Sequence, residues 1–285
     1  MHELSPEPVS AFPSKVEDRP LLVIGRVERD GESIYYEWAV ADDTDDRPVV
    51  VLTHGAGGSH AVWYHQLIAL SSRYRVLTWD SRGFGNSTCN SGVLTVDQAV
   101  ADLAAVLDAV GVDGPVHLVG QSMGGWWVSA YAIADPERGL SLTLSDTPGG
   151  VWTDELREFF ATFRSSTHPG PARVASHFAL GRTTLRTRPD LAFLYQQLGS
   201  FHQPPMAEVA KIVSVSVEPA ALTALGFPLN VIAGAEDSIF PAPMLESIAT
   251  MLGAAYREIA QAGHSPYFES PAAYNEALFA LLGRA

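Results

Sequence analysis

Short, uninterrupted runs of apolar residues alternate with helical patterns along most of this chain. Residues 48–53 (PVVVLT) and 116–119 (VHLV) have the continuous apolar pattern of strands that are buried on both faces of a parallel sheet. Between them, residues 95–110 have apolar side chains at helical spacing, and Gly111 ends that helix. Repeated strand–helix alternation is typical of a mostly parallel sheet with helices on its faces. The sequence therefore predicts an α/β fold.

The remaining elements follow the same alternation. A hairpin is predicted around Asp30-Gly31, where two β-branched and aromatic runs meet. The further predicted strands are 21–26, 33–40, 74–80, 140–144, 229–233 and 255–259, and the further predicted helices are 60–71, 122–134, 243–252 and a C-terminal helix from Pro271.

The alternation divides the chain into four parts. Residues 1–20 are proline-bearing and lack periodicity, which predicts an N-terminal tail. Residues 21–149 and 216–285 contain the predicted strands and form the two parts of one core. Residues 150–215 contain helical patterns but no good strand, so we expect them to form a helical insertion at the end of the sheet where α/β folds bind ligands.

Composition excludes several classes of function. The chain has 285 residues, with 18 Lys and Arg against 32 Asp and Glu, a formal net charge of −14. This balance argues against nucleic acid or an anionic membrane as a partner, because both attract clustered positive charge. The single cysteine, Cys89, excludes an internal disulfide framework and a cysteine-based zinc site.

Targeting signals are also not apparent. No apolar run approaches the roughly 18 residues of a membrane span, and the first residues lack the pattern of a signal peptide. We therefore expect a cytoplasmic protein that acts on a small molecule without a metal or cofactor.

The most informative local motif is G-x-S-x-G at residues 120–124. It directly follows the strand that ends at Val119 and directly precedes a predicted helix. Small residues on both sides of a serine permit a sharp turn that exposes its hydroxyl above the sheet, at the positive end of the helix dipole. Ser122 is thus predicted to be a nucleophile, although a serine N-cap between turn glycines has the same local sequence.

A serine nucleophile needs a base, and the base needs an acid to orient it. His264 lies in a Gly- and Pro-containing loop after the last predicted strand, where the chain order Ser, acid, His places the base. Asp237 follows the strand at 229–233 and is the favoured acid. Asp146, at the end of an earlier strand, and Glu236, next to Asp237, remain alternatives.

Glycines also follow the PVVVLT strand, in residues 54–58 (HGAGG). They allow backbone N–H groups to turn towards a substrate oxygen. The predicted oxyanion hole consists of the Ala56 N–H and the Met123 N–H, the latter from the residue after the nucleophile. The run lacks the Gly-Lys-Ser/Thr ending of a phosphate-binding loop.

Together these motifs resemble the α/β-hydrolase superfamily, and the resemblance covers nearly all of residues 21–285. Five motifs carry it, in order: His54-Gly55; DSRGFGNS at 80–87, similar to D-x-R-G-x-G-x-S; GQSMGG at 120–125; GAED at 234–237; and GHSP at 263–266. The resemblance implies a mostly parallel, doubly wound eight-stranded sheet with residues 150–215 as a helical cap.

The serine elbow resembles esterases, enol-lactonases and carbon–carbon bond hydrolases of ring-cleavage pathways. We expect hydrolysis of a carboxylic ester or lactone of a small to medium organic molecule through an acyl-enzyme. Residues in the 54–58 loop, near the elbow and in the cap are candidates for the substrate pocket: His54, Gly57, Trp126, Trp127, Phe159 and Phe163.

Three alternatives to ester hydrolysis stay open. A carbon–carbon hydrolase of a diketone suits the same triad, but such enzymes usually have Asn before the serine and Trp after the histidine, where this chain has Gln121 and Ser265. A cofactor-free oxygenase would use the His–Asp pair as a base, and the serine would be secondary. A slow-turnover ligand receptor would retain the triad without efficient turnover.

Overall fold

The computed structural model of the chain describes residues 13, 15–42, 44–166, 173–200 and 202–285, without the side chains of 163–166. One eight-stranded sheet lies at its centre, with the strand order β1-β2-β4-β3-β5-β6-β7-β8. In chain order, the strands are β1 (Leu21–Arg29), β2 (Glu32–Val40), β3 (Val49–Thr53), β4 (Arg75–Trp79), β5 (Val116–Gln121), β6 (Gly139–Ser145), β7 (Leu229–Gly234) and β8 (Ala255–Ile259).

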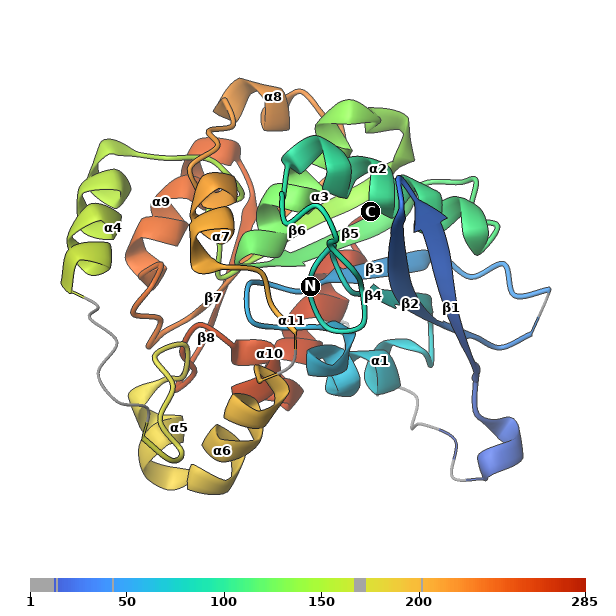
Figure 1. Ribbon diagram of the computed structural model, residues 1–285, viewed down its shortest axis with the longest axis horizontal. Coiled ribbons are helices and arrows are strands. Elements are labelled where there is room, and N and C mark those ends of the chain that lie inside the picture. Colours follow the sequence, from blue (N-terminus) through green and yellow to red (C-terminus); the bar gives the residue numbers. More distant parts are fainter. Residues whose placement is uncertain (1–12, 14, 43, 167–172, 201) are drawn as a thin grey trace, which may run out of the picture.

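Strands β3 to β8 pair in parallel, whereas β2 is antiparallel to both β1 and β4. The predicted α/β class and the mostly parallel eight-stranded sheet are confirmed. Figure 1 shows the β1–β2 hairpin as a long twisted ribbon at one edge of the sheet.

Helices cover both faces of the sheet (Figure 1). The α-helices are α1 (Tyr64–Leu70), α2 (Val96–Ala109), α3 (Met123–Ala134), α4 (Asp154–Ser166), α5 (Arg182–Thr187), α6 (Pro189–Leu198), α7 (Met206–Val213), α8 (Pro219–Thr223), α9 (Ala242–Leu252), α10 (Pro266–Glu269) and α11 (Pro271–Leu282). Three short 3-10 helices complete the described elements: η1 (Val16–Asp18), η2 (His60–Trp63) and η3 (Pro136–Arg138).

The apolar runs of the strands supply two separate cores. In β3, Val49 and Val51 pack into a core with α2, α3 and α9, while Val50 and Leu52 pack into the opposite core with α1 and α11. All four side chains are at most 1% exposed. Continuous apolar sequence is therefore required here, because side chains on both faces of the strand are buried.

Two neighbouring strands in the middle of the sheet have their connections on opposite faces. The chain leaves β3 towards η2 and α1, and it leaves β5 towards α3 on the other face. The carboxyl ends of such strands diverge into a crevice, which is where open α/β sheets bind ligands. In this chain the loop at residues 54–58, after β3, and Ser122, after β5, lie side by side at this point of the sheet.

Between β6 and β7 the described chain forms only helices, α4 to α8. Contacts rather than sequence proximity place α5 beside α10: the Gly181 N–H, directly before α5, donates to the Glu269 carboxylate at 2.7 Å. The segment before α7 contacts the core as well, because the Gly85 N–H donates to the His202 carbonyl at 3.1 Å.

Candidate active site

Ser122 occupies a sharp turn between β5 and α3. Its backbone has φ 50° and ψ −123°, and it is the residue directly before the first turn of α3. Residues other than glycine rarely adopt this backbone conformation, so the surrounding contacts must impose it. The Ser122 N–H donates to the Ser145 carbonyl at 3.0 Å, and the Ser122 carbonyl accepts from the Gly125 N–H at 2.9 Å.

Glycines allow the loop after β3 and the start of α3 to approach this turn closely. A Cβ atom at Gly124 would lie 2.5 Å from the Thr53 carbonyl oxygen and 2.6 Å from that of His54. A Cβ atom at Gly55 would lie 2.7 Å from the Ser122 Cβ. Any larger residue at either position would therefore push the serine turn away from the loop.

His264 and Asp237 form a buried pair near this turn. Nδ1 of His264 lies 2.8 Å from Oδ2 of Asp237, and the two side chains are 6% and 0% exposed. The other oxygen of Asp237 accepts from the backbone N–H groups of Ile239, at 2.7 Å, and Phe240, at 3.1 Å. An ionised Asp237 fixes Nδ1 as the protonated nitrogen and leaves Nε2 with a free lone pair.

The histidine loop is joined to the serine turn through the neighbour of Ser122. The Gln121 side-chain amide donates to the His264 carbonyl at 2.9 Å. The Ser122 hydroxyl itself makes no hydrogen bond to another described residue, and Ser122 is half-buried. Bonds between nucleophile and base are often long in unliganded enzymes and shorten when substrate binds.

The two alternative acids have other partners. Asp146 is fully buried, and its carboxylate accepts from the Gly234 N–H at 2.7 Å and the Ser145 hydroxyl at 3.0 Å. Burial, reinforced by the charge of Asp237, raises the pKa of Asp146 well above its ordinary value. Glu236 faces the residues before α5 and at its start: it accepts from the Thr183 N–H at 2.8 Å and the Thr183 hydroxyl at 2.7 Å.

The glycine-rich loop at 54–58 bends back beside the serine turn. The Gly58 N–H donates to the Gly55 carbonyl at 3.1 Å, and Gly57 has a positive φ of 81°. Ala56 is half-buried, whereas Met123 is fully buried and begins α3, where backbone N–H groups have no partner within the helix. The Gly57 carbonyl accepts from the Gln203 side chain at 3.3 Å.

His54 is completely buried beneath this loop. Its Nδ1 lies 2.8 Å from the Gly55 carbonyl, and its Nε2 accepts from the Ser81 N–H at 3.0 Å. Burial lowers the pKa of His54, which favours the neutral ring that both contacts require. Its predicted place in the substrate pocket stays a prediction, as does that of Gly57.

The predicted aromatic pocket residues lie in different surroundings. Trp126 and Trp127 are 1% and 2% exposed, and the Trp126 ring nitrogen donates to the Val215 carbonyl at 2.9 Å. Phe159 is half-buried in α4. The side chain of Phe163 lies outside the described residues. Of these residues, Trp126 is linked by ring contacts to the His264–Asp237 pair.

An aromatic cluster connects Trp126 to His264. Phe240 links the two, with ring centroids 6.2 Å from Trp126 and 5.8 Å from His264. Phe160 stacks on Phe240 at 5.3 Å, and Trp152 packs against both of these rings. Phe240 has no sequence signal beyond its position three residues after Asp237, and the prediction missed it.

A second histidine–carboxylate group lies where η2 begins, beside the residue that follows β4. Nδ1 of His60 lies 2.8 Å from Asp80, and its Nε2 lies 3.3 Å from Glu37. Burial alone would lower the pKa of His60, but the hydrogen bond and the charge of Asp80 outweigh burial and raise it. His60 lies in η2, at the start of the predicted helix 60–71, and its side chain is only 15% exposed because it contacts Asp80, directly after β4, and Glu37 of β2.

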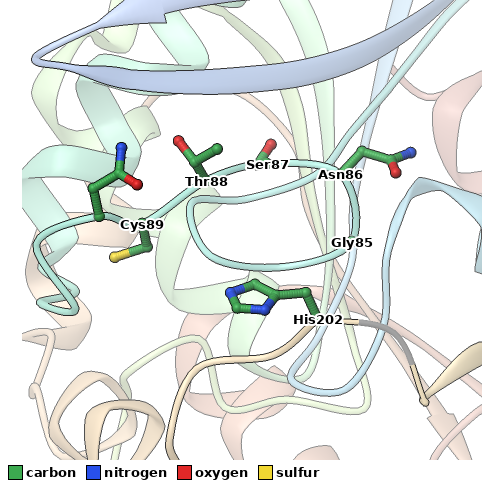
Figure 2. Close-up of a pocket in the computed structure, with 7 residues that line it drawn as sticks. Gly85, Asn86, Ser87, Thr88, Cys89 and His202 are labelled. Atoms are coloured by element: carbon green, nitrogen blue, oxygen red, sulfur yellow. The ribbon is translucent and has the colours of Figure 1, made fainter.

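Two surface hollows are lined by described residues. Figure 2 shows one of about 380 Å³, formed by residues 85–90 and His202, whose imidazole lies below the 85–89 loop. The other, of about 450 Å³, separates Phe178, Leu180, Arg182 and Leu185 from residues 235–238. The first contains none of the predicted site residues, and the second reaches the backbone side of Asp237.

The described part of the chain holds no group of three or more His, Cys, Asp or Glu side chains arranged to bind a metal ion. Among its described helices, none is both long and apolar enough to cross a membrane.

Comparison with known proteins identifies the family of the chain. The model of the alpha/beta hydrolase fold family matches residues 48–271. The chain belongs to this family. Its relatives include enol-lactonases and its structural neighbours include esterases, and the chain is a hydrolase.

Three similar proteins illustrate the range of the family. A Mycobacterium tuberculosis protein named provisionally as the non-heme bromoperoxidase BpoC is 29% identical over 256 residues, 83% of this chain and 94% of the relative. The 3-oxoadipate enol-lactonase 2 of Acinetobacter baylyi is 25% identical over 244 residues, 84% and 90% of the two chains. The solved structure of a thermophilic esterase from Thermogutta terrifontis is 27% identical, with a TM-score of 0.72 over 93% of this chain and 98% of that one.

Proposed function

We propose that the protein is a serine hydrolase that cleaves a carboxylic ester or lactone of a small to medium organic molecule. The observation that carries the proposal is the buried His264–Asp237 pair, with 2.8 Å between Nδ1 and Oδ2, which a hydrogen bond from Gln121 joins to the residue before a serine in a strained strand–helix turn. In this proposal Ser122 is the nucleophile, His264 the base and Asp237 the acid that orients it.

The reaction follows from the positions of these groups. Nε2 of His264 takes the proton of the Ser122 hydroxyl as Oγ attacks the substrate carbonyl carbon. The N–H groups of Ala56 and Met123 stabilise the oxyanion. His264 then gives the proton to the leaving oxygen, the acyl-enzyme forms, and a water activated by His264 releases the acid. Asp237 remains ionised throughout.

The neighbouring parts of the chain have proposed roles as well. We assign residues 150–215 as the cap that covers the site, residues 21–149 and 216–285 as the core, and residues 1–20 as a tail. Trp126 and Phe159 support the pocket wall in this proposal. The similarity to an esterase and an enol-lactonase supports an ester or lactone as substrate.

Pre-steady-state hydrolysis of p-nitrophenyl acetate tests the proposal. Wild type should release a burst of p-nitrophenol equal to the enzyme concentration, because acylation of Ser122 precedes a slower deacylation. Ser122→Ala should show no burst. Activity of Ser122→Ala that consumes O₂ would instead support a cofactor-free oxygenase, and a burst without turnover on any ester, lactone or diketone would support a receptor.

A further inference from the structure

We infer that Glu269 is a positioning residue for His264 and that it couples the histidine loop to the cap. This inference rests on the proposed role of His264 as the base. Glu269 is the last residue of α10, five residues after His264, and it does not touch the imidazole ring in the described contacts.

One carboxylate oxygen of Glu269 holds the histidine loop from both sides. Oε1 accepts from the Gly263 N–H at 2.8 Å and from the Ser265 N–H at 3.3 Å. These are the residues directly before and after His264. With the Gln121 amide on the His264 carbonyl, three hydrogen bonds fix the backbone that carries the imidazole.

The other oxygen of Glu269 reaches the cap. Oε2 accepts from the Gly181 N–H at 2.7 Å, and the Thr184 hydroxyl adds a further bond from α5. The cap backbone lies directly on the histidine loop: a Cβ atom at Gly181 would be 2.8 Å from the Gly263 nitrogen. The Glu269 carboxylate therefore connects the histidine loop to the start of α5 in the cap.

This arrangement fixes the direction of the imidazole. Asp237 constrains Nδ1, but a ring held at one nitrogen can still move with its backbone. Bonds to Gly263 and Ser265 limit that movement, so that Nε2 stays within reach of the serine. A misplacement of about 1 Å at a reacting group can cost about 10²-fold in rate.

Glu236 offers a matched control. Its carboxylate also holds the start of α5 in the cap, through Thr183 and, at 3.4 Å, Arg182, but it accepts nothing from the residues beside His264. Removing Glu236 loosens the cap alone, whereas removing Glu269 loosens both the cap and the histidine loop.

The test compares Glu269→Leu, Glu269→Asp, Glu269→Gln and Glu236→Leu with wild type. Leu supplies no acceptor, and Asp is one methylene too short to reach the amides. Gln can turn its carbonyl oxygen to Gly263 and Ser265 and lose only the bond to Gly181. Three readouts are used: kcat and KM for p-nitrophenyl acetate, the low-field proton NMR signal of the His264 Nδ1–H, and the thermal midpoint of unfolding.

We expect Glu269→Leu and Glu269→Asp to lose between about 10-fold and 10²-fold in kcat and to shift or broaden the low-field signal. Glu269→Gln should keep the wild-type kcat and the low-field signal but raise KM. The same result is expected for Glu236→Leu. The inference is overturned if folded Glu269→Leu or Glu269→Asp keeps kcat and the signal, or if Glu236→Leu loses as much kcat.

The proposed function fails separately from this inference. A wild type that hydrolyses no ester would overturn the proposed function. The low-field signal needs no turnover and would still decide whether Glu269 positions His264.

Discussion

Single residues set the geometry of the serine turn. Ser122 adopts a positive φ of 50° at the junction of β5 and α3, and Gly55 and Gly124 permit the loop after β3 to contact the turn. The conformational strain at Ser122 is therefore offset by close packing that is possible only because Gly55 and Gly124 have no side chains.

Replacing Gly124 by Ala tests this packing. Alanine normally stabilises a helix relative to glycine, but here its Cβ would be 2.5 Å from the Thr53 carbonyl oxygen. We expect the free energy of unfolding to fall by about 1–3 kcal/mol, as for an overpacked core. Denaturant unfolding measures the change. Gly114→Ala is the control, because nothing lies within 4 Å of its Cβ position, and equal stability of both variants would contradict the packing account.

The two buried aspartates near His264 are expected to differ in role. Asp237→Asn should lower kcat for p-nitrophenyl acetate by about 10⁴-fold, because the amide favours the wrong histidine tautomer. Asp146→Asn should lower kcat far less, since Asp146 binds Gly234 and Ser145 rather than His264. Steady-state kinetics of both variants decide between them. A larger loss for Asp146→Asn would make Asp146 the acid.

At the scale of elements, buried charges connect the loops to the helices behind them. Arg82, in the loop after β4, makes two bonds to Asp102 of α2, at 2.7 and 2.9 Å, and the two side chains are 4% and 0% exposed. The pair joins the loop after β4 to a helix on one face of the sheet.

Breaking this pair should destabilise the protein. Asp102→Asn leaves a buried guanidinium without its counter-charge, and we expect a loss of about 3–5 kcal/mol in the free energy of unfolding. The exposed pair Arg188–Asp190 is the comparison: Asp190→Asn should leave stability unchanged within error. If the two substitutions behave alike, the buried pair does not stabilise the fold as proposed.

The sequence could predict the elements but not the contacts between them. Strands such as β3 and the elbow at Ser122 were predictable because burial on both faces and tight turns leave local patterns. Three features could not be predicted: the hydrogen bonds of Glu269, the position of Phe240 beside His264 and the low exposure of His60. Each depends on contacts between residues that are far apart in the chain. The periodicity of apolar residues along the chain does not say which distant residues contact one another.

The whole molecule carries a net charge of −14 and several buried ionisable groups. Burial lowers the pKa of His117, in β5, and of His177, before α5, to about 4 from 6.5. His117 accepts or donates a bond to the Ser141 hydroxyl at 2.8 Å, and the His177 Nδ1 accepts from the Ala179 N–H at 3.2 Å.

Stability should therefore depend on pH between about 4 and 6.5. In this window the unfolded histidines bind protons and the folded ones do not, so the free energy of unfolding rises with pH and is lost on acidification. Each histidine contributes up to about 3 kcal/mol. Urea unfolding at several pH values should show a shallower slope for His117→Gln than for the control His202→Gln, an exposed histidine. Parallel slopes would contradict this assignment.

The proposed function of the whole molecule requires that Ser122 is a nucleophile activated by His264. Intact-protein mass after exposure to a small fluorophosphonate measures it directly, in wild type, Ser122→Ala and His264→Ala. The account predicts one adduct on wild type and none on either variant within the same time. No adduct on folded wild type, or an adduct that persists in Ser122→Ala, would contradict it.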